Sequence, residues 1–145
     1  MIRKVAVAAL AGVALAGAAA ASPPPGELTV RVSNVRNAKG VVRIGLCPQA
    51  AFLKPDCPYE AAVPAHTGVT TLTLRGVVPG AYGLQVFHDE NANHKVDKAL
   101  FGLPKEGVGF SNDAPIRMAP PKWSDAVFAV AGGAQTIQVK MRYFL

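Results

Sequence analysis

Strict alternation of apolar and polar residues is the feature of this sequence that most constrains its fold. The segment ELTVRVSNV at 27–35 carries an aliphatic side chain at every second position, Leu28, Val30 and Val32. A period of two is that of a β-strand with one buried face. No segment after residue 21 shows sustained helical spacing of apolar residues, so we expect no helix longer than about ten residues.

Further segments repeat this alternation, and turn residues separate them. The RNAKG stretch at 36–40 and the glycine pair at 132–133 each lie between two such segments, so we expect a β-hairpin at both places. Pro79-Gly80 predicts a tight turn. The further segments and their apolar residues are 41–47 (Val42, Ile44, Leu46), 69–77 (Leu72, Leu74), 81–89 (Tyr82, Leu84, Val86), the shorter run 125–131, and 135–144 (Ile137, Val139, Met141, Tyr143).

About seven short strands at this spacing predict an all-β fold, an antiparallel β-sandwich of immunoglobulin-like or transthyretin-like shape. A small closed barrel is the alternative. About 35 residues between the strand that ends near Phe87 and the one that begins near Ala126 show only weak periodicity. Loops of that length in compact domains are usually functional or disordered. We expect this one to be ordered, with a short strand or a turn of helix inside it.

Residues 1–21 have the composition of a secretory signal peptide. Arg3 and Lys4 precede an uncharged run of Ala, Val, Leu and Gly, and the alanines at 19–21 supply the small residues that signal peptidase requires. The run is short and rich in Ala and Gly, which makes it a poor membrane span. We therefore expect export, cleavage near residue 21, and a single domain at 22–145 that is periplasmic or secreted.

The expected mature domain is mildly basic. Fifteen Lys and Arg, less Arg3 and Lys4, stand against nine Asp and Glu, which leaves a net charge of about +4. The basic residues are scattered and are not interleaved with aromatic residues, so we expect no nucleic-acid partner. A charge of this size favours solubility and contact with anionic envelope surfaces.

Cys47 and Cys57 are the two cysteines of the chain. An even number of cysteines in an exported protein predicts a disulfide, and two buried thiols are the alternative. A bridge across ten positions stabilises a fold by roughly 3 kcal/mol in the loop-entropy model. The cysteines form neither a CxxC pair nor a four-ligand zinc set.

The segment HDENANHKVD at 88–97 carries oxygen donors in the register of a calcium loop. Asp89, Asn91 and Asn93 occupy positions 1, 3 and 5 of a loop of the EF-hand type. The carbonyl of Lys95 is at position 7, and Asp97 is at position 9. These five groups predict one weakly bound calcium ion.

Two residues of the loop depart from that pattern. His94 stands at position 6, where Gly is usual because the backbone turns sharply, and Leu100 stands at position 12 in place of a bidentate Glu. Glu106 or Asp113 is the candidate to complete the ligand shell. The alternative is an Asx-rich turn whose side chains bond their own backbone.

Residues 78–114, VPGAYGLQVFHDENANHKVDKALFGLPKEGVGFSNDA, resemble the signature of a family of small exported bacterial proteins, the domain of unknown function 2141 family. That signature reads P-G-x-Y, then F-H-D-x-N-x-N-G-x-x-D, then F-G-x-P-x-E-G-x-G-F-S-N. The match has no gap, and His94 stands where the signature has Gly. The resemblance implies a secreted β-sandwich with no established activity.

Catalysis is an alternative that would depend on a few specific residues. His88 and Glu106 are candidates for acid–base chemistry in a hydrolase, and Ser111 is a candidate nucleophile. No G-x-S-x-G or H-E-x-x-H arrangement accompanies them. His88 together with His94 and Asp97 is an alternative ligand set for zinc or copper.

The function that the sequence predicts is a non-enzymatic binding or envelope-associated module with a weak calcium loop. The first alternative is a protein that binds a small hydrophobic or carbohydrate ligand with its long loop, and a pocket lined by Phe110 and Trp123 would favour it. The second alternative is the hydrolase, and an open cleft with His88 beside a carboxylate would favour it.

The calcium prediction is testable by thermal unfolding. The missing carboxylate at Leu100 and the sharp turn at His94 place the expected dissociation constant near 10⁻⁴ to 10⁻³ M, roughly. Calcium at ten times that value should stabilise the fold by roughly 1.4 kcal/mol, a rise of a few degrees in melting temperature. Asp89→Ala should abolish the rise, and His94→Gly should strengthen it. A melting temperature that calcium leaves unchanged up to about 10 mM would show that the segment is only a turn.

Overall fold

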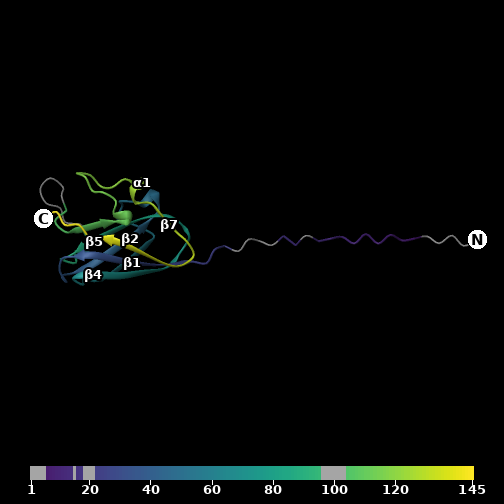
Figure 1. The fold of residues 1–145 in the computed structure, drawn as a ribbon, viewed down its shortest axis with the longest axis horizontal. Coiled ribbons are helices and arrows are strands. Elements are labelled where there is room, and N and C mark those ends of the chain that lie inside the picture. Colours follow the sequence, from purple (N-terminus) through teal and green to yellow (C-terminus); the bar gives the residue numbers. More distant parts are fainter. Residues whose placement is uncertain (1–5, 15, 18–21, 96–103) are drawn as a thin grey trace, which may run out of the picture.

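The computed structural model describes residues 6–14, 16–17, 22–95 and 104–145. Within these ranges, eight strands form two sheets that pack face to face, an all-β sandwich as the alternation predicts (Figure 1). The described part of the chain before residue 22 runs away from the domain as an extended segment. Among the described residues, no helix is long and apolar enough to cross a membrane.

The described elements are eight strands and three short helical segments. The longest described helix has four residues, in agreement with the expectation of no helix longer than about ten. The order is β1 Gly26–Val35, β2 Val41–Cys47, η1 Gln49–Ala51, β3 Tyr59–Pro64, β4 Gly68–Val77, β5 Gly80–Asp89, β6 Gly107–Phe110, η3 Ser111–Asp113, α1 Trp123–Ala126, β7 Phe128–Val130 and β8 Gly133–Lys140. Elements β6, η3 and α1 are the short structures expected inside the long interval.

Several strands that are neighbours in sequence lie in different sheets, whereas β2 and β3, and β5 and β6, pair within one sheet. One sheet has the order β4-β1-β8, and the other has the order β3-β2-β5-β6, with β7 also paired to β5. All these strand pairs are antiparallel except β1 with β8, which are parallel. The chain therefore crosses repeatedly from one layer to the other.

Both predicted hairpins are wrong. Strand β1 pairs with β4 and β8, whereas β2 pairs with β3 and β5, so the turn at 36–40 carries the chain across the sandwich. Strand β7 pairs with β5 and β8 pairs with β1, so the glycine pair at 132–133 also joins the two sheets. Alternation specifies only which face of a strand is buried. That face is buried in the same way whether the next strand pairs beside it or lies in the opposite sheet, so alternation does not specify the pairing.

The predicted apolar faces meet in one core between the sheets. Burial of an aliphatic side chain of this kind stabilises a fold by about 1.5–3 kcal/mol. The core residues include Leu28, Val30, Val32, Val42, Ile44, Leu46, Leu72, Leu74, Tyr82, Leu84, Val86, Val139 and Met141, and Ile137 and Tyr143 pack against them.

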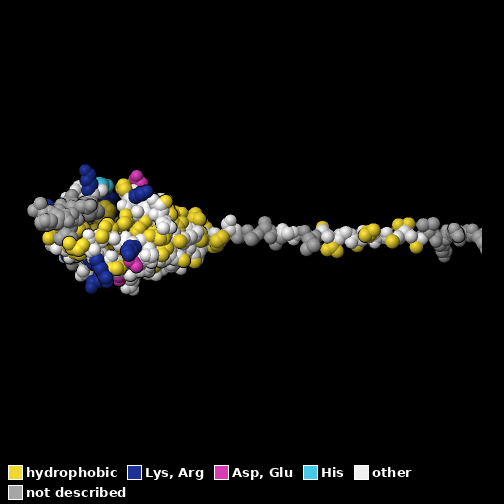
Figure 2. All heavy atoms as spheres, turned by 90° about the horizontal axis from the view of Figure 1, so that it is seen from above, with side chains coloured by type: hydrophobic (Ala, Val, Ile, Leu, Met, Phe, Trp, Pro, Cys, Tyr) yellow, Lys and Arg dark blue, Asp and Glu magenta, His cyan; other side chains and the backbone are white. Residues whose placement is uncertain are grey.

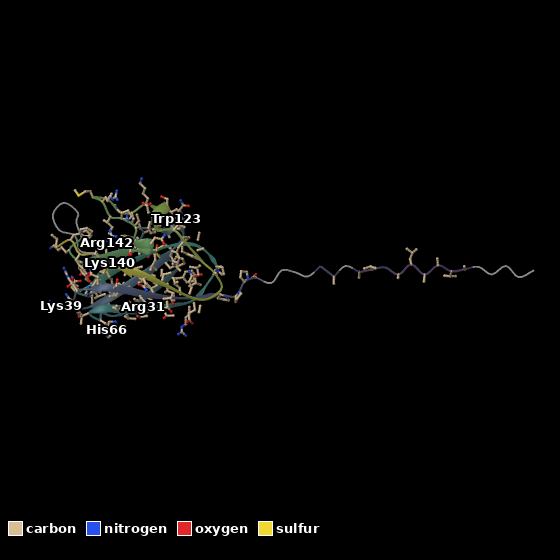
Figure 3. The ribbon with its side chains drawn as sticks, viewed as in Figure 1. Arg31, Lys39, His66, Trp123, Lys140 and Arg142 are labelled. Carbon is tan, nitrogen blue, oxygen red and sulfur yellow. A yellow bond between two sulfur atoms is a disulfide. The ribbon has the colours of Figure 1, made fainter. Side chains whose placement is uncertain are left out.

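A second, smaller hydrophobic cluster lies outside this core. Phe52 packs edge to face against Phe110 and Trp123, with ring centroids 6.2 and 5.5 Å apart. A Cβ atom on Gly83 of β5 would lie 2.8 Å from the Phe52 ring, so the glycine lets the rings close onto the sheet. Trp123 is thus a packing anchor at α1, on the opposite side of the domain from His66 (Figure 3).

The predicted disulfide is present between Cys47 and Cys57, whose Cα atoms are 4.9 Å apart. Cys47 is fully buried at the end of β2, and the bridge closes the irregular loop that holds η1. The loop joins β2 to β3, so the bridge limits how far it can open.

Removal of the disulfide is expected to lower the free energy of unfolding by about 3 kcal/mol, since the unfolded chain regains the entropy of the open loop. Chemical denaturation of the double variant Cys47→Ala, Cys57→Ala measures this loss. Wild-type protein treated with a thiol reductant is the matched control and should lose a similar amount. Equal stability of the oxidised wild type and the double variant would contradict the role of the bridge.

Candidate functional site

The five-stranded sheet carries a groove of about 1400 Å³ on its outer face. Strand register defines the floor, because residues paired across neighbouring strands point to the same face. Three strand spacings of about 4.8 Å make the floor roughly 14 Å wide. It consists of two cross-strand rows. The first row is Ala62, Arg43, Phe87 and Val108, and the second row is Glu60, Gly45, Gln85 and Phe110.

Segments from outside the sheet form the walls of the groove. One wall is the segment 53–56, and Gln85 on the floor holds it in place. Its side-chain oxygen accepts a hydrogen bond from the Leu53 N–H at 3.0 Å, and its amide nitrogen donates to the Lys54 carbonyl at 2.8 Å. Another wall is the segment 116–120, which follows β6 and η3 at the side of the domain away from β4 (Figure 1).

Apolar side chains dominate the lining. Phe87, Val108 and Phe110 supply the apolar part of the floor, and exposed apolar residues stand on the walls. Leu53 is 44% exposed and Met118 is 96% exposed. Hydrophobic side chains cover much of the domain surface in Figure 2, with Lys and Arg side chains scattered among them. Exposed apolar surface of this extent, with charged side chains beside it, is typical of a binding site.

Cationic side chains outnumber acidic ones around the groove. The cations are Arg43, Lys54, Lys95 and Arg117, and the acids are Asp56 and Glu60. Among the described residues, the salt bridges involve none of Lys54, Lys95 and Arg117. The lining therefore carries an excess of positive charge.

Arg43 joins the groove to the loop that begins at Asp89. Its Nε donates to Asp89 Oδ2 at 3.0 Å, and its Nη2 lies 3.3 Å from Nε2 of His94. The Asp89 side chain is fully buried, whereas that of Arg43 is 21% exposed. A buried carboxylate requires such a partner, because an unpaired charge in the interior is strongly unfavourable.

The loop itself has the geometry of an Asx-rich turn. The carboxylate of Asp89 accepts the backbone N–H groups of Asn93 at 3.0 Å and His94 at 2.9 Å. Asn91 Oδ1 accepts from the Asn93 N–H at 3.3 Å, and Asn93 Oδ1 accepts from the Lys95 N–H at 2.9 Å. The three described side chains among the four predicted as metal ligands thus bond backbone of their own turn, as the alternative interpretation describes.

Some parts of the calcium prediction have a counterpart in the structure. His94 has a φ of +64°, as position 6 of such a loop requires. Glu106 is buried and accepts the Glu90 N–H at 3.1 Å. Asp97 and Leu100 lie outside the described residues. Within the described ranges, no group of three or more His, Cys, Asp and Glu is placed to hold a metal ion.

Burial raises the pKa of the Asp89 carboxyl. The Arg43 guanidinium and the N–H groups of His94 and Asn93 lower this pKa by more, so it lies below its usual range. The ionised form is therefore the one that the native turn stabilises.

His88 is fully buried, and both nitrogens of its ring contact polar groups. Its Nε2 lies 2.7 Å from the Lys39 carbonyl, which only accepts, so Nε2 carries the proton. Its Nδ1 then accepts from the Tyr143 hydroxyl at 2.9 Å, and that hydroxyl accepts from the Arg36 N–H at 3.1 Å. Both ring nitrogens are engaged, and the open cleft that would favour a hydrolase is not present at His88.

Ser111 has a structural role that sequence reasoning missed. Strand β5 pairs with β7 up to Tyr82 and with β6 from Gln85 onward, which leaves the Leu84 N–H between two partners. Ser111 Oγ accepts that N–H at 3.0 Å and donates to the Ala126 carbonyl at 2.5 Å. The buried hydroxyl thus fills the break where β5 changes partner, and the serine of the GFSN signature is explained by this contact.

The glycines of the same signature are explained by close packing. A Cβ atom on Gly107 would lie 2.5 Å from the Tyr143 ring, and one on Gly109 would lie 2.8 Å from Val139. Strand β6 can approach the end of β8 because neither residue has a side chain. The GVG stretch is therefore a tightly packed strand, and Phe110 after it belongs to both the aromatic cluster and the groove floor.

This geometry defines the class of the protein, an all-β sandwich with an apolar groove on its larger sheet. A comparison with known families matches residues 30–138 to a family described as uncharacterised proteins conserved in bacteria (DUF2141). The chain belongs to this family, which confirms the resemblance of its signature. Comparisons with curated proteins and with solved structures gave no match.

The substitution Asp89→Asn is expected to lower the free energy of unfolding at pH 7 by about 2 kcal/mol, because hydrogen bonds to a charged group contribute about 1.5–3 kcal/mol. The folded pKa lies below the unfolded value of about 3.9, so this contribution is complete above that pH and is lost as the pH falls through the folded pKa. Urea unfolding at several pH values should therefore show the wild type and the variant converging below about pH 4.

The matched control for this substitution is Glu27→Gln. Glu27 lies at the surface, 3.8 Å from Arg75, where an ion pair contributes little. Its substitution should leave stability nearly unchanged at every pH. A difference between Asp89→Asn and wild type that persists undiminished at low pH would contradict the assigned pKa.

Proposed function

We propose that this protein is an exported, non-enzymatic binding module that holds a small, largely apolar ligand in the groove of the five-stranded sheet. The observation that carries the proposal is the groove, about 1400 Å³ in volume, with a mostly apolar lining and a smaller number of polar and charged side chains. Ligand sites in proteins have this composition, since apolar burial supplies affinity and sparse polar groups supply orientation.

The contacts that hold the floor and one wall of the groove support a site that is formed before the ligand binds. Its floor is a sheet whose other face packs on the buried core, and Gln85 and the Cys47–Cys57 disulfide hold the wall at 53–56. A site that needs little ordering on binding loses less conformational entropy. Phe110 lines the groove as the ligand-binding alternative expected, whereas Trp123 packs on Phe52 and lies outside the lining.

Export to the periplasm or the cell exterior is part of the proposal. The leader at 1–21 has signal-peptide composition. The disulfide supports the same compartment, because such bonds persist in oxidising environments.

A weak calcium site at the Asp89 turn is the second candidate function. The observation that favours it is the positive φ of His94 at the position where a calcium loop needs one. Calcium would compete with Arg43 for Asp89 Oδ2, since both are cations that bind the same oxygen. This competition is a further reason for weak affinity.

Binding in the groove is testable with the neutral fluorescent probe N-phenyl-1-naphthylamine. We expect saturable fluorescence enhancement with the wild type. Phe87→Asp on the floor and Met118→Asp on the wall should each weaken binding about tenfold or more, because a carboxylate beside an apolar ligand loses hydration.

The control variant is Val78→Asp, which places the same charge at an exposed apolar residue outside the groove lining. It should bind the probe as the wild type does. Absence of binding to the wild type would overturn the proposal, and equal binding by all three variants would locate the probe elsewhere.

A further inference from the structure

We propose that the ligand of this groove is an amphiphile with one acidic head group, and that Arg43 binds the head group. This inference rests on the proposed function of the groove and adds the chemical class of its ligand. It follows from the position, the hydrogen bonding and the charged neighbours of Arg43.

Arg43 is the one cation on the groove floor among the described residues. It lies on β2 in the same cross-strand row as Phe87 and Val108. The other cations of the lining, Lys54, Lys95 and Arg117, belong to the walls or to the turn after β5. A head group at Arg43 therefore sits at the level of the sheet, with the apolar residues of the same row beside it.

The guanidinium of Arg43 is held in place and still has donors available. Its Nε is bonded to the buried carboxylate of Asp89, which fixes the plane of the group. Its Nη2 contacts the His94 ring, and within the described part of the chain Nη1 has no hydrogen-bond partner. An oriented guanidinium with free N–H groups loses little entropy when it binds a carboxylate or a phosphate.

The surrounding charges favour an anion over a neutral ligand. Lys95 lies at the Arg43 end of the groove and Arg117 on the wall at 116–120, and the lining holds more cationic side chains than the two acids Asp56 and Glu60. An apolar ligand without charge would cover these cations and leave them without water or a partner, which is unfavourable. A single anionic group offsets that loss.

The rest of the floor fits an apolar body attached to this head group. Phe87 and Val108 follow Arg43 across β5 and β6, two strand spacings or about 10 Å. Phe110 in the next row and Met118 on the wall extend the apolar surface. A hydrocarbon chain that starts at Arg43 can thus lie across the sheet.

Isothermal titration calorimetry with dodecanoic acid and with dodecanol, below their aggregation concentrations, tests the inference. The wild type should bind the acid at least about tenfold more tightly than the alcohol, since a charge-assisted hydrogen bond contributes about that factor. Arg43→Gln should remove this preference and leave the affinity for dodecanol unchanged within about twofold. Dodecyl phosphate in place of the acid assigns the head group, because the tighter of the two anions identifies its chemistry.

Two further variants separate head-group recognition from damage to the fold. Arg75→Gln removes an exposed arginine of β4, outside the groove lining, and should keep the preference for the acid. The double variant Arg43→Gln, Asp89→Asn removes both charges of the buried pair, so Asp89 is not left unpaired, and it should lose the preference as Arg43→Gln does.

Two outcomes would overturn the head-group inference. One is equal affinity of the wild type for the acid and the alcohol, and the other is a preference for the acid that persists in both Arg43 variants. In either case the groove would still be a binding site. Failure of the wild type to bind any of the three compounds would instead overturn the proposed function.

Discussion

Strand β5 in the middle of the five-stranded sheet is the element on which the rest of the structure depends. Its inward side chains Tyr82, Leu84 and Val86 fill the core between the sheets. Its outward side chains Gln85 and Phe87 form part of the groove floor. Because the pleat sends alternate residues to opposite faces, one strand supplies both stability and a surface for binding.

The end of β5 joins the core, the polar turn and the groove. Asp89 is buried at this point, and its charge is balanced by Arg43 and by two backbone N–H groups. Burial of a charge is unfavourable unless its partners are in place, so the turn and the arginine depend on each other. The same pair turns a floor residue into an oriented cation, and the proposed head-group binding follows from this feature of the fold.

Much of the fold could be predicted from the sequence, and part of the site could not. The buried faces of β1, β2, β4, β5 and β8, the disulfide and the family signature follow from local patterns. The two hairpins were predicted wrongly, because a turn between alternating segments has the same composition whether the next strand pairs beside the first or crosses to the other sheet. The roles of Ser111 and Arg43 depend on which strands are neighbours, which no local pattern specifies.

The sequence by itself determined which side of each strand is buried, because hydrophobic burial acts on every strand separately and its period can be read along the chain. For the segment after Phe87 it predicted a weak calcium loop, with a turn on its own Asp and Asn side chains as the alternative, and the hydrogen bonds of that turn are seen in the tertiary structure. Only the tertiary structure decided that Ala62, Arg43, Phe87 and Val108 stand in one row beneath a groove. That row combines three strand pairings between segments distant in sequence, and pairing of this kind is fixed by the packing of the whole sandwich.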